Sequence, residues 1–119
     1  MKIPAGKQLR LIHTGRSSGK EFSVTVWYAQ LDGDLWVGSL DDSRNWVRNM
    51  RASGRVKVDF GDGPIQCECK WADDEGWERG PETGQRFRDA IQAKYPLMSR
   101  VIRLLQRGGN PVACRLRPV

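Results

Sequence analysis

The stretch that decides the fold is EFSVTVWYAQLDGDLWVGSL, which runs from Glu21 to Leu40. Along Glu21–Leu31 the side chains alternate with a period of two, which is typical of a strand with one buried face. The pair Asp32-Gly33 follows, and an Asp-Gly pair between two alternating runs indicates a tight hairpin. We therefore predict that Asp34–Leu40 returns antiparallel to the strand before it.

The same alternation recurs on both sides of this hairpin. Arg55–Phe60 and Pro64–Trp71 flank Gly61-Asp62-Gly63 and predict a second hairpin. A short apolar run at Gln8–Thr14 predicts the first strand, and Val112–Leu116 predicts the last. The sequence thus contains six candidate strands.

Helical spacing appears in two places between the strands. Ser43–Ala52 has apolar residues at helical intervals, with possible caps at Asp41–Ser43 and Gly54 beyond its end. Glu82–Tyr95 has the same spacing, a proline interrupts it, and Leu97–Leu105 continues it. We therefore expect one short helix between the hairpins and further helix before the last strand.

These elements predict a mainly β fold, a six-stranded antiparallel barrel with a few helices. Closing a sheet of short strands into a barrel removes edges that could pair with another chain. With 119 residues, 39% of them hydrophobic, the chain is long enough for one core. We expect a single domain over residues 1–119.

Composition narrows the classes of function and location. The sequence has no apolar run long enough to span a bilayer and no apolar signal core near Met1, so we expect a cytoplasmic protein. Three cysteines, Cys67, Cys69 and Cys114, fit neither a disulfide framework nor a zinc site by their spacing. We interpret them as reduced core residues and predict no metal site.

The formal charge of +6 and the pI near 9.7 indicate an anionic partner. Nucleic acid, a phosphorylated cofactor and a membrane surface all meet that description. The basic residues are spread along the chain without a polybasic tail, which favours a folded basic surface over a disordered arm.

The turn Thr14–Lys20 concentrates groups that can bind an anion. Glycines 15 and 19 allow the backbone to direct amide hydrogens into one concavity, and the turn adds hydroxyl groups and two bases. Such a set can replace the hydration of a phosphate or carboxylate with fixed donors. By spacing alone, a solvated hairpin loop explains the turn more simply. The candidate residues are Thr14, Gly15, Arg16, Ser17, Ser18, Gly19 and Lys20.

A resemblance favours the anion site. The stretches LRLIHTGRSSGKEFSVTVWYAQLDGDLWVGS and SRNWVRNMRASGRVKVDF, within Leu9–Phe60, carry a Thr-Gly-Arg turn, a strand, a hairpin and a helix with Trp and Asn three apart. In this order they resemble the nitroreductase-like oxidoreductases that depend on the deazaflavin coenzyme F-420, within the pyridoxamine-phosphate-oxidase-like FMN-binding split barrels. The match covers about half of the chain, and AKYP at Ala93–Pro96 is similar to a late helix of the family.

The resemblance implies a split β-barrel, usually a homodimer, which holds a flavin-type cofactor in a groove. The turn Thr14–Lys20 would grip the phosphate of the cofactor, and Tyr95 would face a substrate. Ser17 stands where the family usually has a base, and Thr25 where it often has proline. The residues implied along the ring are Thr25, Val26 and Trp27, and those implied to complete the pocket are Gly38, Ser39, Trp46 and Asn49.

The implied reaction is hydride transfer from the deazaflavin, or alternatively from FMN, to a small acceptor such as a quinone, nitro compound or enone. No Ser-His-Asp or Cys-His arrangement can be built around His13, the single histidine, which we place near the pocket. Two alternatives stay open. One is a non-catalytic carrier of flavin, tetrapyrrole or lipid on the same barrel. The other, ranked last, is a nucleic-acid-binding barrel with exposed Trp27 and Trp36.

Overall fold

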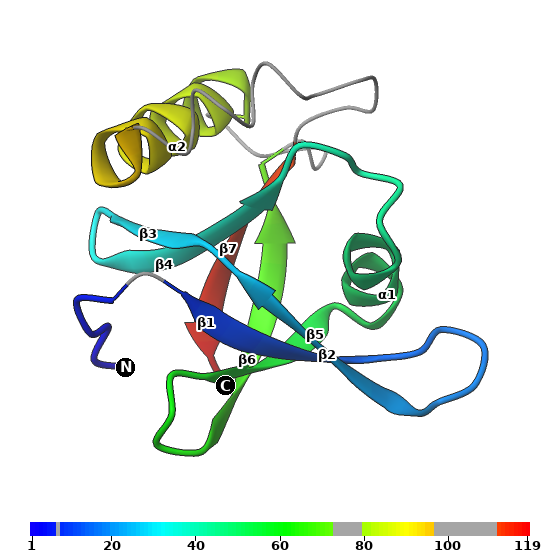
Figure 1. The fold of residues 1–119 in the computed structure, drawn as a ribbon. Coiled ribbons are helices and arrows are strands. Elements are labelled where there is room, and N and C mark those ends of the chain that lie inside the picture. Colours follow the sequence, from blue (N-terminus) through cyan, green and yellow to red (C-terminus); the bar gives the residue numbers. More distant parts are fainter. Residues whose placement is uncertain (7, 73–79, 97–111) are drawn as a thin grey trace.

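The computed structural model describes residues 1–6, 8–72, 80–96 and 112–119, with the backbone alone for 80–85 (Figure 1). These residues form one seven-stranded sheet and two helices. The strands are β1 (Leu9–Thr14), β2 (Glu21–Val26), β3 (Tyr28–Leu31), β4 (Asp34–Ser39), β5 (Arg55–Asp59), β6 (Pro64–Trp71) and β7 (Val112–Pro118). The helices are α1 (Asn45–Ser53) and α2 (Gly80–Lys94).

The sheet is curled so that its two edges belong to one continuous stretch of chain. Its strand order is β2-β1-β5-β6-β7-β4-β3, and every neighbouring pair is antiparallel. β2 and β3 therefore lie at opposite ends of the order, although only Trp27 separates them in sequence. The backbone joins the two edges at Trp27, without a hydrogen-bonded ladder between them. The predicted mainly β, antiparallel split barrel is confirmed.

The number of strands differs from the prediction, because the expected single strand Glu21–Leu31 is two strands. Val26 pairs with Leu9 of β1, whereas Tyr28 pairs with Val37 of β4. The alternation of side chains continues through this point, so the sequence pattern does not reveal that the strand changes its partner. The barrel therefore has seven strands in the described part of the chain, where six were expected.

Both predicted hairpins are confirmed. Asp32 and Gly33 have positive φ angles of 53° and 82°, as a type I′ turn requires, and they join β3 to β4. Gly61 and Gly63 also have positive φ angles, in the turn between β5 and β6. The carboxylate of Asp59 accepts a hydrogen bond from the backbone N–H of Gly61 at 2.7 Å, which closes this second turn.

Helix α1 begins two residues later than predicted, and the expected acidic caps have another role. Its N-cap is Arg44, which makes no side-chain capping hydrogen bond. The carboxylate of Asp41 instead accepts hydrogen bonds from the backbone N–H and the hydroxyl of Ser43, at 2.9 and 2.6 Å. The predicted end is confirmed: Gly54 is left-handed (φ 70°) and its N–H donates to the carbonyl of Met50 at 2.8 Å.

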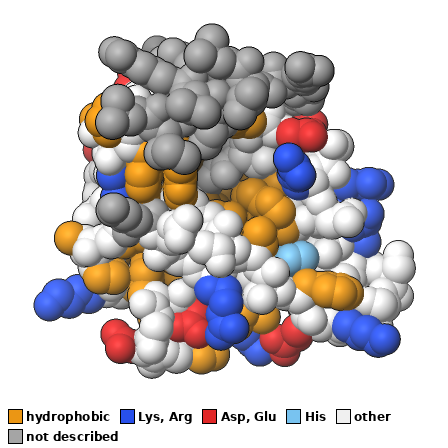
Figure 2. Space-filling view, in the orientation of Figure 1, with side chains coloured by type: hydrophobic (Ala, Val, Ile, Leu, Met, Phe, Trp, Pro, Cys, Tyr) orange, Lys and Arg blue, Asp and Glu red, His pale blue; other side chains and the backbone are white. Residues whose placement is uncertain are grey.

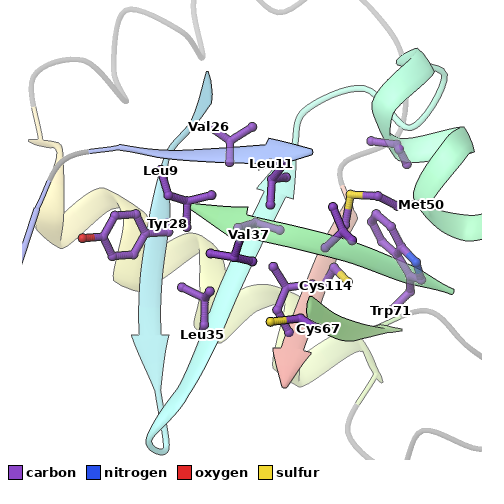
Figure 3. Close-up of a cluster of buried hydrophobic side chains, with 14 of the residues drawn as sticks. Leu9, Leu11, Val26, Tyr28, Leu35, Val37, Met50, Cys67, Trp71 and Cys114 are labelled. Atoms are coloured by element: carbon purple, nitrogen blue, oxygen red, sulfur yellow. The ribbon is translucent and has the colours of Figure 1, made fainter. Parts of the chain in front are cut away.

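The core fills the inside of the curled sheet (Figure 3). Alternate residues of β1 and β4 point into it, and α1 adds Val47 and Met50. Burying a side chain of this size contributes about 1.5–3 kcal/mol. The buried members are Leu9, Leu11, Val26, Tyr28, Leu35, Val37, Val47, Met50, Val56, Val58, Cys67, Trp71, Val112, Cys114 and Leu116.

Helix α2 lies against β3 and β7 (Figure 1). Phe87 packs there with Trp36 and Ala113 in a second, smaller cluster. The predicted helix Glu82–Tyr95 is confirmed, although it begins two residues earlier and ends one residue earlier, at Gly80 and Lys94. The predicted helix Leu97–Leu105 lies outside the described residues.

The three cysteines are free thiols, with Cys67 and Cys114 buried and Cys69 partly buried. Burial raises the pKa of the Cys67 thiol to about 11, so this thiol is protonated at neutral pH. Among the described residues, no three histidine, cysteine or acidic side chains gather as they would around a metal ion. No helix among them has the length and apolar character needed to cross a membrane.

Candidate functional site

The turn between β1 and β2 is held by bonds within its own backbone. The N–H of Gly15 donates to the carbonyl of Lys20 at 2.8 Å, and the N–H of Gly19 donates to the carbonyl of Gly15 at 3.0 Å. Gly19 has a φ of +70°, which few other residues adopt at low cost. The N–H of Lys20 donates to the hydroxyl of Ser18 at 3.2 Å. The conformation of the turn is therefore fixed by its own hydrogen bonds.

At the tip of this turn, two successive backbone amides have no hydrogen-bond partner in the described chain. Ser17 and Ser18 are exposed, and within the described part of the chain their N–H groups have no hydrogen-bond partner. The sequence predicted that successive amides of the turn would point into one concavity, but four amides of the turn, those of Gly15, Arg16, Gly19 and Lys20, are used inside the turn or by Asn49. Two successive amides in a turn are the kind of backbone donors that can bind an anionic oxygen.

Arg16 links the turn to helix α1. Its backbone N–H donates to Asn49 Oδ1 at 3.1 Å, and its guanidinium donates to the same oxygen at 2.7 Å. No acidic side chain in the described segments forms an ion pair with Arg16. The remaining N–H groups of the guanidinium are thus available to an anion at the turn.

Asn49 connects Arg16 to His13 on β1. Asn49 is 4% exposed, and its Nδ2 lies 3.0 Å from His13 Nδ1. Because Oδ1 faces two donors on Arg16, the amide must place Nδ2 towards the histidine, where it donates. His13 Nδ1 is therefore an acceptor, and the neutral ring carries its proton on Nε2.

His13 is 6% exposed and stacks on Phe22 of β2, with ring centroids 5.9 Å apart. Burial lowers the pKa of His13, which agrees with the neutral form that its bond to Asn49 requires. In Figure 2 the single histidine lies between hydrophobic side chains, and Lys and Arg side chains gather on the same side of the molecule, where Figure 1 places α1 and the turn. The prediction that His13 lies near the candidate site agrees with its bond to Asn49.

The three residues expected along a cofactor ring lie in different environments. Thr25 is exposed on β2, and Val26 packs in the core. Trp27 is partly buried and stacks on Tyr95, with ring centroids 4.4 Å apart and an angle of 11° between the planes. The structure thus brings together Trp27 and Tyr95, which are far apart in sequence.

Lys94 was not identified from the sequence, although it joins this aromatic pair to the barrel. Its Nζ donates to the carbonyl of Tyr28 at 3.0 Å and lies 3.6 Å from the centroid of the Tyr28 ring. It also lies 5.4 Å from the centroid of the Tyr95 ring. Burial lowers the pKa of Lys94 and raises that of Tyr95. A lysine at the end of an amphipathic helix gives no sequence signal for such a position.

The remaining predicted residues have structural roles. A Cβ on Gly38 would collide with Phe87 of α2 and come within 2.7 Å of the carbonyl of Val112, so packing accounts for this glycine. The hydroxyl of Ser39 donates to the carbonyl of Asp41 at 2.8 Å. Trp46 is partly buried against the main core. That Gly38, Ser39 and Trp46 contact a cofactor remains a prediction.

The candidate residues form two groups that strand β2 connects. The first group is the turn with Arg16, Asn49 and His13, and the second is Trp27 with Tyr95. The six residues of β2 lie between them and span about 20 Å at the usual rise of a strand. Because β2 ends the sheet, the backbone groups on its outer side have no neighbouring strand in the described chain.

The curled sheet and its joined edges define a split-barrel protein, and the comparisons with known proteins agree. No protein-family model matches the chain, and no curated protein does. Among solved structures, Rv2991 from Mycobacterium tuberculosis matches with a TM-score of 0.70 and 17% identity, over 96% of this chain and 74% of that one.

Two other solved structures carry functional descriptions. HutZ, the heme storage protein from Vibrio cholerae, matches with a TM-score of 0.64 and 15% identity, over 95% of this chain and 82% of that one. An F420-H2 dependent reductase matches with a TM-score of 0.61 and 19% identity, over 97% of this chain and 98% of that one. At such identities the likeness shows the split-barrel fold.

Proposed function

We propose that this split barrel binds a flavin-type cofactor that carries a phosphate and serves as a reductase of small electron-poor acceptors. The cofactor is the deazaflavin coenzyme F-420, with FMN as the alternative. The observation that supports the proposal is the β1–β2 turn, where Ser17 and Ser18, whose amides have no partner in the described chain, directly follow Arg16, whose guanidinium is bonded to Asn49. Fixed amides and a guanidinium are the donors that phosphate oxygens accept best.

The residues of this chain fit such a cofactor at both ends. The turn, with the further charge of Lys20, would hold the phosphate. The outer edge of β2, which pairs with no strand in the described part of the chain, would offer backbone donors and acceptors to the edge of a heterocyclic ring, as sheet edges do for peptides. Trp27, at the end of β2, would pack against the face of the ring.

The bound cofactor would supply the hydride for a quinone, nitro compound or enone. The protein would bind and orient the acceptor and exclude water. Tyr95 is the proposed substrate contact, because it already covers Trp27 and its phenol has a raised pKa, so it remains a neutral hydrogen-bond donor at neutral pH. For an acceptor to reach the ring, Tyr95 would have to move away from Trp27.

A titration of the purified protein with each cofactor tests the proposal. We expect spectral changes on binding of F-420 and FMN, with tighter binding of F-420. Arg16→Ala should weaken binding by about 1.5–3 kcal/mol, the value of a charge-assisted hydrogen bond. Arg86→Ala removes the same charge from an exposed ion pair with Asp32 and serves as the control.

The outcomes separate the possible functions. If neither cofactor binds, the redox proposal is wrong. If binding occurs but the reduced cofactor transfers no hydride to any of the three classes of acceptor, a carrier role is favoured. The likeness to HutZ, which is described as a heme storage protein, makes haem the first ligand to test in that case.

A further inference from the structure

Two buried side chains, His13 and Asn49, determine where the guanidinium of Arg16 lies. Asn49 Oδ1 accepts from both the backbone and the side chain of Arg16, while the other end of the same amide is bonded to His13 Nδ1. We propose that His13 and Asn49 are positioning residues that hold Arg16 at the anion-binding turn, and that protonation of His13 Nδ1 releases it. This inference rests on the proposed function, because it assumes that the turn binds an anion.

The chemistry of the three side chains explains the release. A proton on His13 Nδ1 would convert an acceptor into a donor that faces the Nδ2 donor of Asn49. To recover a hydrogen bond, the amide would rotate by half a turn and present Nδ2 to Arg16. The backbone N–H and guanidinium of Arg16 are also donors, so both of their bonds to α1 would be lost. The proton comes from solvent, and no covalent bond between heavy atoms changes.

The neighbours of His13 on the strands are apolar, so protonation of His13 affects Arg16 through Asn49. On the inner side of β1 its neighbour is Leu11, opposite Val58 of β5, and on β2 it faces Phe22. The bond to Asn49 comes from α1. On the outer side of β1, Arg10 forms an ion pair with Asp59 of β5, and Lys57 of β5 forms one with Glu21 of β2. Arg51 of α1 lies over the ring of Trp71. The other charged groups near His13 are Arg16, which lies beyond Asn49, and the exposed Arg48 of α1 and Arg55 of β5.

The release should outweigh the direct attraction between a protonated histidine and the anion. Nδ1 is directed at Asn49, and the exposed turn is screened by salt with a Debye length of about 8 Å at physiological ionic strength. The release of the Arg16 guanidinium, in contrast, removes a donor at the anion-binding turn itself. Anion binding should therefore weaken in acid.

A double-mutant cycle tests the positioning role with FMN as the probe at pH 8. We expect Arg16→Ala and Asn49→Leu each to weaken FMN binding about tenfold or more, and the double variant to be little weaker than either. Additive losses would overturn the inference. So would unchanged binding by Asn49→Leu while Arg16→Ala is impaired, a result that leaves the proposed function standing. Unchanged binding by Arg16→Ala would reject both.

The unmodified protein provides a second test, which does not depend on the folding of a variant. Because His13 is the only histidine, nitrogen NMR of the imidazole reports its protonation without assignment. We expect a neutral ring with the proton on Nε2 at pH 7.5. A proton on Nδ1 at that pH would overturn the inference.

The pH profile of FMN affinity completes the test. Below about pH 6.5, the ordinary pKa of histidine, the affinity of the unmodified protein should fall more steeply than that of His13→Gln, whose side chain accepts a hydrogen bond without titrating. The phosphate of FMN titrates in both proteins, so the difference between the profiles belongs to His13. Parallel profiles would overturn the proton-driven release.

Discussion

At the scale of single residues, the ability of the turn between β1 and β2 to bind an anion depends on which backbone N–H groups the turn already uses. Gly15, Gly19 and Lys20 give their N–H groups to the turn itself, and Arg16 gives its own to Asn49. Only the tip at Ser17–Ser18 retains backbone donors, within the described chain. A side chain introduced at the tip would therefore act directly on a bound anion.

Ser17→Lys should tighten the binding of both FMN and F-420. The new ammonium would add a charge contact at an exposed position, where such contacts contribute about 0–1 kcal/mol, so we expect up to about fivefold. The gain should shrink as salt rises. Gln30→Lys adds the same charge at an exposed position of β3 and is the control in a titration at low and high salt. Equal gains in the two variants would show a general effect of charge and contradict a specific contact.

His13 should make the free energy of unfolding depend on pH in a defined window. Its pKa in the folded protein is lowered below the ordinary value of 6.5, so the unfolded chain takes up the proton first as pH falls. The contribution of His13 is therefore complete above pH 6.5 and is lost as pH falls through 6.5 towards the lower folded pKa. Urea unfolding at pH 8, 6.5 and 5.5 should show a smaller decline for His13→Gln than for the unmodified protein. Equal declines would exclude a buried neutral histidine.

The sequence was sufficient to select the residues of the turn but not their contacts. Arg16 and Asn49 were both candidates, yet they are 33 residues apart, and their bond exists because α1 packs against β1. His13 and Asn49 are 36 residues apart and meet for the same reason. Contacts that depend on how an element docks have no signature in local spacing.

At the scale of elements, the position of α2 depends on a residue without a side chain. Gly38 of β4 packs against the ring of Phe87. A Cβ atom at this position would collide with that ring and with the carbonyl oxygen of Val112. The hydrogen-bond partner of β4 in this region is β7, with Gly38 opposite Ala113. The place where α2 meets the sheet is thus too narrow for a methyl group.

Gly38→Ala should lower the free energy of unfolding by about 1–3 kcal/mol, the usual cost of overpacking. Urea unfolding provides the measurement. Phe87→Leu removes part of the obstructing ring, so the same alanine should cost less in that background, and the cycle isolates the contact. An equal cost in both backgrounds would mean that the ring is not the obstacle.

Turn chemistry determined how well the elements could be predicted. Both hairpins were found, because Asp-Gly and Gly-Asp-Gly require positive φ angles that few other sequences supply. The exchange of partners at Trp27 was missed, because alternation reports which face is buried and not which strand lies alongside. The start of α1 was misplaced, because Asp41 bonds to Ser43 in the preceding turn.

At the scale of the whole molecule, the two end strands of the curled sheet, β2 and β3, each have one edge that pairs with no other strand in the described chain. Helix α2 lies against β3. β2 is terminal in the strand order, and Phe22 on it is 49% exposed. Natural proteins usually cover or disrupt such an edge, because it can pair with another chain. Here the edge also connects the two groups of candidate site residues, so whatever lies against it would form one wall of the site.

We predict that the protein is a homodimer in which the second chain helps to wall the cofactor groove. Light scattering at about 10 μM and physiological salt should give twice the chain mass of 13.5 kDa, because salt screens the repulsion between two chains of charge +6. If the partner completes the site, FMN must bind the dimer more tightly than the monomer, and by linkage it must favour association. Dilution should therefore yield monomers at a higher protein concentration without FMN than with it. A mass of 13.5 kDa at every concentration, with FMN present and absent, would contradict the dimer, and a dimer whose dissociation ignores FMN would contradict the shared wall.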